Sequence, residues 1–164
     1  MSVPASKKDA DVEAMARLQA GDDLALNEIM DRWTPRIHAY LFRLLGNSED
    51  AQDLTQETFV AVYSSSGRYR PTAKFSSWIF GIAANQARQR IRWRMRHPEV
   101  ALEVLGEENE PAGHKPADTQ TPVTIMDASE RAEAVRRAIQ SLPLAMREML
   151  LLAEYEDLPQ SEIA

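Results

Sequence analysis

Basic side chains crowd into one part of this chain, although the chain as a whole carries a formal net charge of −6. No acidic residue occurs from Thr58 to Pro98, whereas the same stretch contains Arg68, Arg70, Lys74, Arg88, Arg90, Arg92, Arg94 and Arg96. A local charge so opposed to the global one suggests a polyanion partner, and nucleic acid is the commonest polyanion. The chemistry in question is the neutralisation of a phosphate backbone.

Aromatic side chains lie among these bases, at Tyr69, Phe75, Trp78, Phe80 and Trp93. Together the two residue types suit backbone neutralisation combined with base stacking. They equally fit arginines that solvate a long helix and aromatics that fill a core, and composition alone leaves both interpretations open. The spacing favours nucleic acid, because Arg88, Arg92 and Arg96 fall at i, i+4 and i+8, where like charges repel unless an anion binds them.

An acidic and amide face precedes the basic stretch. Asp50, Asp53 and Glu57 fall at i, i+3 and i+7 of a predicted helix, with Gln56 beside them. Such a stripe is either a solvated surface or a face that binds another protein. Spacing alone does not separate these two interpretations.

Helices must position both faces, and the apolar periodicity predicts a series of them. We expect a disordered start over residues 1–10, a helix from Asp11 to Gly21, and a second helix capped by Asp22 or Asp23. Pro35 then opens a third helix, which stops at Gly46.

Two further helices carry the polar faces themselves. Asn47 and Ser48 cap the acidic helix, and Ser76 or Ser77 caps the basic helix, which runs to about Arg96. Phe75 and Trp78 fit the buried side of the basic helix, whereas Asn85 lies on its polar side, within reach of a base edge.

The C-terminal part of the chain changes character twice. Residues 98–126 are rich in acids and proline and predict a flexible linker, either a passive tether or an acidic segment that occupies a basic channel of a partner. Residues 127–164 become helical again, with Pro143 at the start of one helix. The prediction is therefore an all-α protein of two small helical domains, 1–97 and 127–164, joined by the 98–126 linker.

Several classes of function are disfavoured by composition. The chain has no cysteine, so disulfides and thiolate metal sites are excluded, and its three histidines are scattered. We therefore predict no metal, no cofactor and no enzymatic activity. The sequence shows neither a secretory h-region nor an apolar run of membrane-spanning length, so we expect a cytoplasmic protein without membrane insertion.

The order of these segments resembles that of the bacterial extracytoplasmic-function sigma factors, small two-domain members of the sigma-70 family. The resemblance is carried by RLLGNSEDAQDLTQETFVAVY, with its D-x-x-D-L-x-Q-E-x-F pattern, and by FSSWIFGIAANQARQRIR, with its F-x-x-W-I-x-x-I-A-x-N pattern. An acidic linker and SLPLAMREMLLLAEYEDLPQSEIA follow in the same order. The resemblance covers nearly the whole chain from about Val12.

The resemblance implies two jobs for the first domain, region 2. Its acidic helix docks on the clamp helices of the largest catalytic-core subunit of RNA polymerase, and the matching residues are Asp50, Asp53, Gln56 and Glu57. The following loop and helix open the promoter −10 element. Tyr69, Phe80 and Asn85 match positions that surround a flipped-out base, while Arg68, Arg70, Lys74, Arg88, Arg90, Arg92, Arg94 and Arg96 would contact the DNA backbone.

For the second domain, region 4, the resemblance implies a helix-turn-helix that reads the −35 element. DLPQSEIA matches only the start of its first helix, so we expect a chain truncated within region 4 that does not footprint this element. Such proteins are commonly held by an anti-sigma factor wedged between the two domains. Two rival interpretations are a nucleic-acid-binding regulator without a polymerase partner and a helical interaction module that does not bind DNA.

Overall fold

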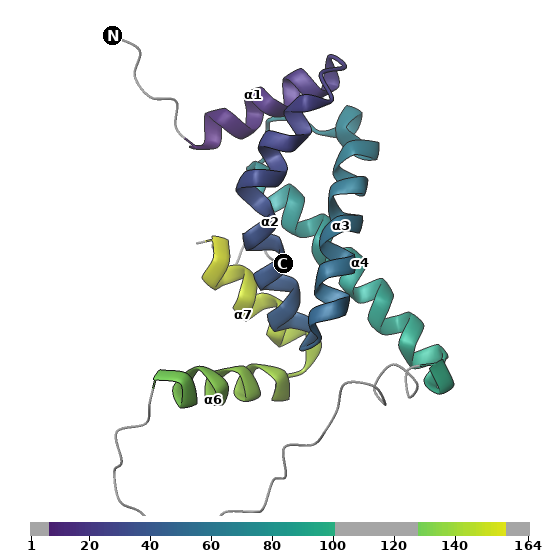
Figure 1. Ribbon diagram of the computed structural model, residues 1–164, viewed down its shortest axis with the longest axis vertical. Coiled ribbons are helices and arrows are strands. Elements are labelled where there is room, and N and C mark those ends of the chain that lie inside the picture. Colours follow the sequence, from purple (N-terminus) through teal and green to yellow (C-terminus); the bar gives the residue numbers. More distant parts are fainter. Residues whose placement is uncertain (1–6, 101–127, 157–164) are drawn as a thin grey trace, which may run out of the picture.

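The described residues of the chain, 7–100 and 128–156 in a computed structural model, form an all-α fold (Figure 1). The elements are α1 (Lys7–Gln19), α2 (Leu24–Leu45), α3 (Ser48–Ser65), the short 3-10 turn η1 (Ser66–Arg68), α4 (Phe75–Arg96), α6 (Ala128–Ser141) and α7 (Leu144–Glu156). No helix within these ranges is both long enough and apolar enough to cross a bilayer.

The first helix begins earlier than the sequence suggested. We expected residues 1–10 to be disordered, but α1 starts at Lys7, while residues 1–6 lie outside the described part. Asp11 anchors this end of the helix. Its buried carboxylate accepts hydrogen bonds from Arg32 Nε at 2.9 Å and from Trp33 Nε1 at 3.1 Å, both on α2.

The predicted helix break before Pro35 is wrong, because α2 runs without interruption from Leu24 to Leu45. A proline inside a helix removes one hydrogen bond and costs about 3 kcal/mol. Here the buried stripe continues through it, from Ile29 and Trp33 to Ile37 and beyond. Each such side chain contributes about 1.5–3 kcal/mol of burial, which outweighs the local loss.

Both ends of the loop between α2 and α3 follow the prediction. Gly46 ends α2 in the left-handed conformation, at φ 73°, and its N–H donates to the Phe42 carbonyl. Asn47 then caps α3, because its side-chain oxygen accepts from the Asp50 N–H at 2.9 Å. The cap expected for α4 is different: Lys74 precedes the helix without a side-chain hydrogen bond, so neither Ser76 nor Ser77 serves.

An aromatic cluster forms the centre of the core between α2, α4 and the residue that follows η1. Phe75 and Trp78 belong to it, which confirms their predicted packing role. Phe75 is buried and lies edge-on to Trp33, with ring centroids 5.5 Å apart. Trp78 is half-buried, and its ring centroid lies 5.8 Å from that of Phe75.

Helix α6 packs against α2, and α7 packs against both α2 and α4 (Figure 1). Pro143 directly precedes α7, as its sequence predicted, and Leu151 is fully buried on the inner side of that helix. Of the predicted 98–126 linker, residues 98–100 are helical and 101–126 lie outside the described residues.

Arg147 fixes the turn between α6 and α7 to the C-terminal end of α2. Its Nη1 donates to the Leu44 carbonyl at 2.7 Å, and its other nitrogens donate to carbonyls of the α6–α7 turn. Gln140 on α6 adds a bond to the Arg43 carbonyl. These donors satisfy carbonyls that the end of α2 would otherwise leave without partners. Burial lowers the pKa of Arg147 from its usual value.

Candidate nucleic-acid interface

The acidic face of α3 divides into an exposed part and a buried part. Asp53 and Gln56 face solvent, and the Glu57 side chain is 52% exposed. Asp50 departs from the expectation of one shared surface, since its side chain is only 5% exposed. Asp50 lies in the first turn of α3, where Arg90 and Arg94 of α4 meet it. Asp50 is therefore a contact between helices, while its three companions remain at the surface.

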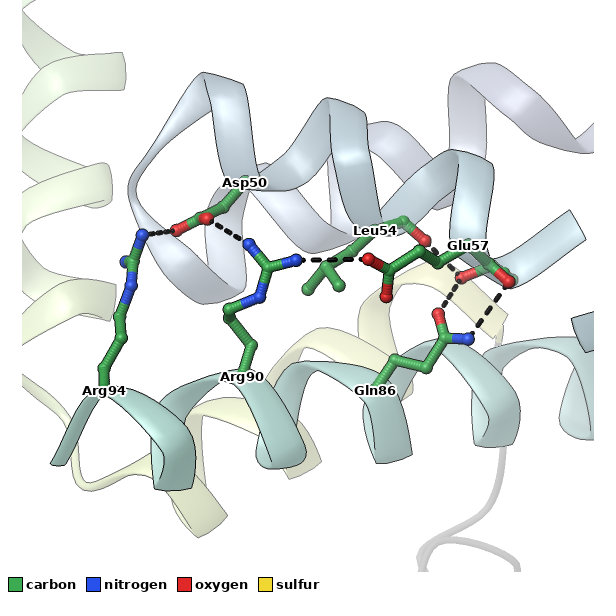
Figure 2. Close-up of polar contacts among 7 residues, drawn as sticks. Asp50, Leu54, Glu57, Gln86, Arg90 and Arg94 are labelled. Carbon is green, nitrogen blue, oxygen red and sulfur yellow. Dashed lines mark hydrogen bonds and ion pairs between the residues drawn. The ribbon is translucent and has the colours of Figure 1, made fainter. Parts of the chain in front are cut away.

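Asp50 lies between two guanidinium groups of α4 (Figure 2). Arg90 Nη1 donates to Asp50 Oδ1 at 2.8 Å, and Arg90 Nη2 donates to Glu57 Oε1 at 3.2 Å. Arg94 Nη2 lies 2.5 Å from Asp50 Oδ2, a charge contact without the direction of a hydrogen bond. We call these four residues the Asp50 cluster. Both arginines, predicted as DNA-backbone ligands, are thus paired with carboxylates of α3 in this structure.

Gln86, one helical turn before Arg90, extends the same seam. Its Nε2 donates to the Glu57 carbonyl at 3.0 Å, and its Oε1 accepts from Thr58 Oγ1 at 3.1 Å. The sequence interpretation missed this residue. A signal was present, because positions 86, 90 and 94 are spaced by four and share one helical face.

Arg88 is also paired within the protein. Its Nη1 lies 3.3 Å from Glu148 Oε2 on α7, so this basic side chain is not an unoccupied phosphate ligand. The sequence interpretation missed Glu148 as well. Its signal was its place on the apolar side of α7, four residues after Leu144 and three before Leu151.

The remaining bases of the predicted DNA-binding set are at the surface. The exposed members are Arg68, Arg70, Lys74, Arg92 and Arg96. Arg70 donates to the Gly67 and Tyr69 carbonyls, and Arg96 Nε donates to the Arg92 carbonyl at 3.4 Å. The surface bases thus form two groups, one in the η1–α4 loop and one at the C-terminal end of α4.

The three residues expected around a flipped base are not brought together in an open pocket. Asn85 is exposed, as expected, but Tyr69 is 3% and Phe80 is 1% exposed. The Phe80 ring packs on Tyr40 at 5.1 Å, and Tyr69 packs on Trp78 at 5.0 Å. Both are core residues here, because the aromatic cluster buries them. Burial, followed by the nearby Asp11 carboxylate, raises the pKa of Tyr69.

A groove of about 720 Å³ runs between α3 and the second half of α4. Its walls carry opposite charges, with Asp53 and Glu57 on one side and Arg92 and Arg96 on the other. Trp93 lies among these arginines, is 41% exposed and stacks on His97 at 4.7 Å. Within residues 7–100 and 128–156, no three acidic or histidine side chains are grouped to hold a metal ion.

Comparisons with known proteins consistently find similarity to sigma factors. A family model of Sigma-70 region 2 matches residues 29–97. The RNA polymerase sigma-H factor of Pseudomonas aeruginosa is 30% identical over 159 residues, which covers 96% of this chain and 82% of that protein. The ECF RNA polymerase sigma-E factor of Escherichia coli is 28% identical over 97% of this chain and 83% of that protein.

Two solved structures share the fold. An engineered region 2 of sigmaE, determined in complex with GTAAAA, has a TM-score of 0.52 at 28% identity over 59% of this chain and 97% of that one. CnrH, determined in complex with the cytosolic domain of CnrY, has a TM-score of 0.61 at 23% identity over 95% of this chain and 81% of that one.

Proposed function

Because the chain belongs to the sigma-70 family, as a sigma factor of the extracytoplasmic-function class, we propose that α3 docks it on core RNA polymerase while α4 contacts promoter DNA. The observation that carries this proposal is the groove between the two helices. One wall is acidic and exposed, the other is basic and exposed, and they lie side by side. A single chain can then hold two partners of opposite charge.

The polymerase side of the proposal uses Asp53, Gln56 and Glu57. They are exposed on α3, and carboxylates and an amide complement the arginine-bearing clamp helices that the family implies. Val60, 65% exposed one turn further along α3, adds an apolar contact beside them. Asp50 is left out of this docking surface because it is buried.

The DNA side uses the two surface groups of bases for phosphates and Asn85 for a base edge. An amide offers a donor and an acceptor together, which suits edge reading. The likeness to a region 2 that was determined with GTAAAA supports this assignment. Tyr69 and Phe80 are packed in the core, so neither ring offers an open stacking face to a base in this conformation.

The proposed function also includes a cellular location, a role in promoter melting and an inhibitory partner. The chain would act in the cytoplasm as a non-catalytic initiation factor that helps to melt the −10 element, and the polymerase core would supply the chemistry. An anti-sigma factor would bind the chain and keep it inactive until transcription from its promoters is required. Exposed Met146, Met149 and Leu150 on α7 offer such a partner an apolar surface.

Charge reversal tests the docking surface. The double variant Asp53→Lys with Glu57→Lys should lower affinity for core polymerase at least tenfold, about 1.4 kcal/mol, measured by pull-down and fluorescence anisotropy. Glu13→Lys with Asp31→Lys is the matched control, because both acids are exposed and the net-charge change is identical. Undiminished binding by the first variant would reject the docking assignment.

A second candidate function is a DNA-binding regulator without a polymerase partner. It is favoured by the exposed bases at the end of α4, which do not depend on the acidic face. The same experiment separates the two, because this candidate binds DNA and never co-purifies with core polymerase.

A further inference from the structure

Apolar packing holds only the first part of α4. Its buried residues are Phe75, Ile79, Phe80, Ala83, Ala84 and Ala87, and none of the following residues of the helix is buried. The last turns nevertheless carry Arg92, Trp93 and Arg96, which are exposed beside the groove. The last turns of α4 therefore lack the fully buried apolar contacts that hold its first part.

The Asp50 cluster is the contact that lies at this end. Arg90 and Arg94 follow the last buried residue, Ala87, and reach across to α3, as Figure 2 shows. Both guanidinium groups converge on one carboxylate whose own side chain is 5% exposed. The Arg90 contact is a charge-assisted hydrogen bond, which is short and directional, and Arg94 adds a second opposite charge at the same carboxylate.

Asp50 is the central member of the cluster. Removal of one arginine leaves the carboxylate paired with the other, whereas removal of the carboxylate leaves Arg90 with Glu57 alone and takes from Arg94 its contact with α3. The two guanidinium groups, 26% and 27% exposed, would then lose the carboxylate that lies between them. The end of α4 would then keep the Arg90–Glu57 contact with α3 and lose both contacts at Asp50.

We propose that Asp50 is a positioning residue, which fixes the C-terminal half of α4 on α3 so that Arg92, Trp93 and Arg96 meet promoter DNA at a set place relative to the polymerase-docking face. The proposal rests on the function proposed above and deepens it. It assigns Arg90 and Arg94 to the scaffold rather than to the phosphates, and it removes Asp50 from the polymerase contact.

Asp50→Asn tests it directly, because the amide keeps the shape and removes the charge. The matched control is Asp53→Asn, three residues along α3 and exposed. We expect the Asp50→Asn holoenzyme to assemble with an affinity for core polymerase within twofold of wild type, and to open a promoter at least fivefold more slowly. Asp53→Asn should show the opposite split, with weaker assembly and little effect on opening once assembled.

A loss of core affinity in Asp50→Asn as large as that in Asp53→Asn would overturn the proposal, and so would normal assembly with normal opening. Failure of the docking function gives a different pattern, in which the Asp53→Lys and Glu57→Lys double variant keeps full core affinity. The two failures are therefore distinguishable.

Arg94→Gln provides a second test of the positioning role if Asp50→Asn does not fold. Arg94 is 27% exposed near the end of α4, and its replacement leaves Asp50 paired with Arg90. The slope of log affinity against log salt, measured on duplex promoter DNA, should be unchanged in Arg94→Gln, because the side chain is not a phosphate ligand. A slope smaller by about 0.9 would show that Arg94 neutralises one phosphate and would overturn the assignment.

A double-mutant cycle completes the test where both single variants fold. If Arg94 acts through Asp50, the promoter-opening defects of Asp50→Asn and Arg94→Gln should not add in the double variant. Additive defects would mean that the two residues act independently, which the proposal forbids.

Discussion

Phe80 and Asn85 lie five residues apart on α4 and face different surroundings. Phe80 contacts the Tyr40 and Trp33 rings and is 1% exposed, whereas Asn85 faces solvent. The two positions therefore offer substitutions with separable effects, one on the folding of the domain and one on the reading of DNA.

Phe80→Ala should lower the free energy of unfolding by about 3–5 kcal/mol, because it leaves a cavity in the aromatic cluster. Asn85→Ala should change it by no more than about 0.5 kcal/mol and should weaken one −10 base preference by about 1–3 kcal/mol. Urea denaturation and binding to a panel of −10 oligonucleotides measure both. Unchanged base preference in Asn85→Ala would remove Asn85 from the DNA surface.

Sequence reasoning succeeded at this scale where a residue's role is local. The Asn47 cap, the Gly46 stop and the packing of Phe75 depend on neighbours within a few positions. It did not anticipate Asp50 with Arg90 and Arg94, because their partners lie 40 or more residues apart and spacing on one helix does not show what the facing helix supplies. The burial of Phe80 depends on the same kind of long-range contact, with Trp33 and Tyr40 on α2.

Among the elements, the end of α2 is the point where three helices meet. Gly46 has φ 73°, and a Cβ there would lie 3.0 Å from Gln140 Oε1 on α6. Gln140 in turn accepts from Arg147 Nη1 at 3.1 Å. The left-handed turn and the packing of α6 thus both depend on the absence of a Cβ at Gly46.

Gly46→Ala should therefore destabilise the protein by more than the strain of the turn alone. A left-handed alanine costs about 1–2 kcal/mol. Gly21→Ala is the matched control, because Gly21 also has positive φ, at 96°, and no atom lies within 4 Å of its added Cβ. We expect a larger loss of unfolding free energy at Gly46, measured in urea. Equal losses would mean that Gln140 moves aside without cost.

Element boundaries show a second limit of the sequence. Pro35 predicted a helix start by its local preference, but the apolar stripe on both sides of it belongs to one continuous helix. Tertiary burial overrides local propensity in such cases, and α2 is long because both of its halves pack on the same core.

Across the whole molecule, α7 joins α2 and α4 through charged groups as well as apolar ones. Glu148 is largely buried and lies 3.3 Å from Arg88. Burial raises the pKa of Glu148 above its ordinary value of 4.5, and the Arg88 charge acts in the opposite direction. The same carboxylate and arginine influence the neighbouring Tyr40, whose pKa is raised chiefly by its burial.

This pKa shift predicts a pH dependence with a definite sign. A raised pKa means that the folded protein holds the Glu148 proton more tightly than the unfolded chain. Its stabilising contribution is therefore complete below about pH 4.5 and is lost as pH rises through the raised pKa. The difference in unfolding free energy between wild type and Glu148→Gln should decrease over that range. Glu154→Gln, at an exposed position, is the control, and a constant difference would contradict the prediction.

The all-α class, the order of the segments and the two charged surfaces were available from the sequence. The packing of α6 and α7 on α2 and α4 was not, because it rests on Arg147 and Glu148, which contact residues 103 and 60 positions away. An amphipathic pattern predicts that the apolar face of a helix will be buried. It does not predict which neighbouring helix will bury it.

The Arg147 contacts also bear on the order in which the helices pack during folding. Closing a longer stretch of chain costs more entropy, so contacts between distant residues tend to form after those between near ones. The α3–α4 bonds join residues 28 to 40 positions apart, while Arg147 reaches Leu44 across 103. We therefore expect Arg147→Ala to accelerate unfolding and to leave the folding rate nearly unchanged, measured by stopped-flow tryptophan fluorescence. A slower folding rate would place α7 in the folding nucleus; otherwise the docking of α7 is a late step, taken after α3 and α4 have already met.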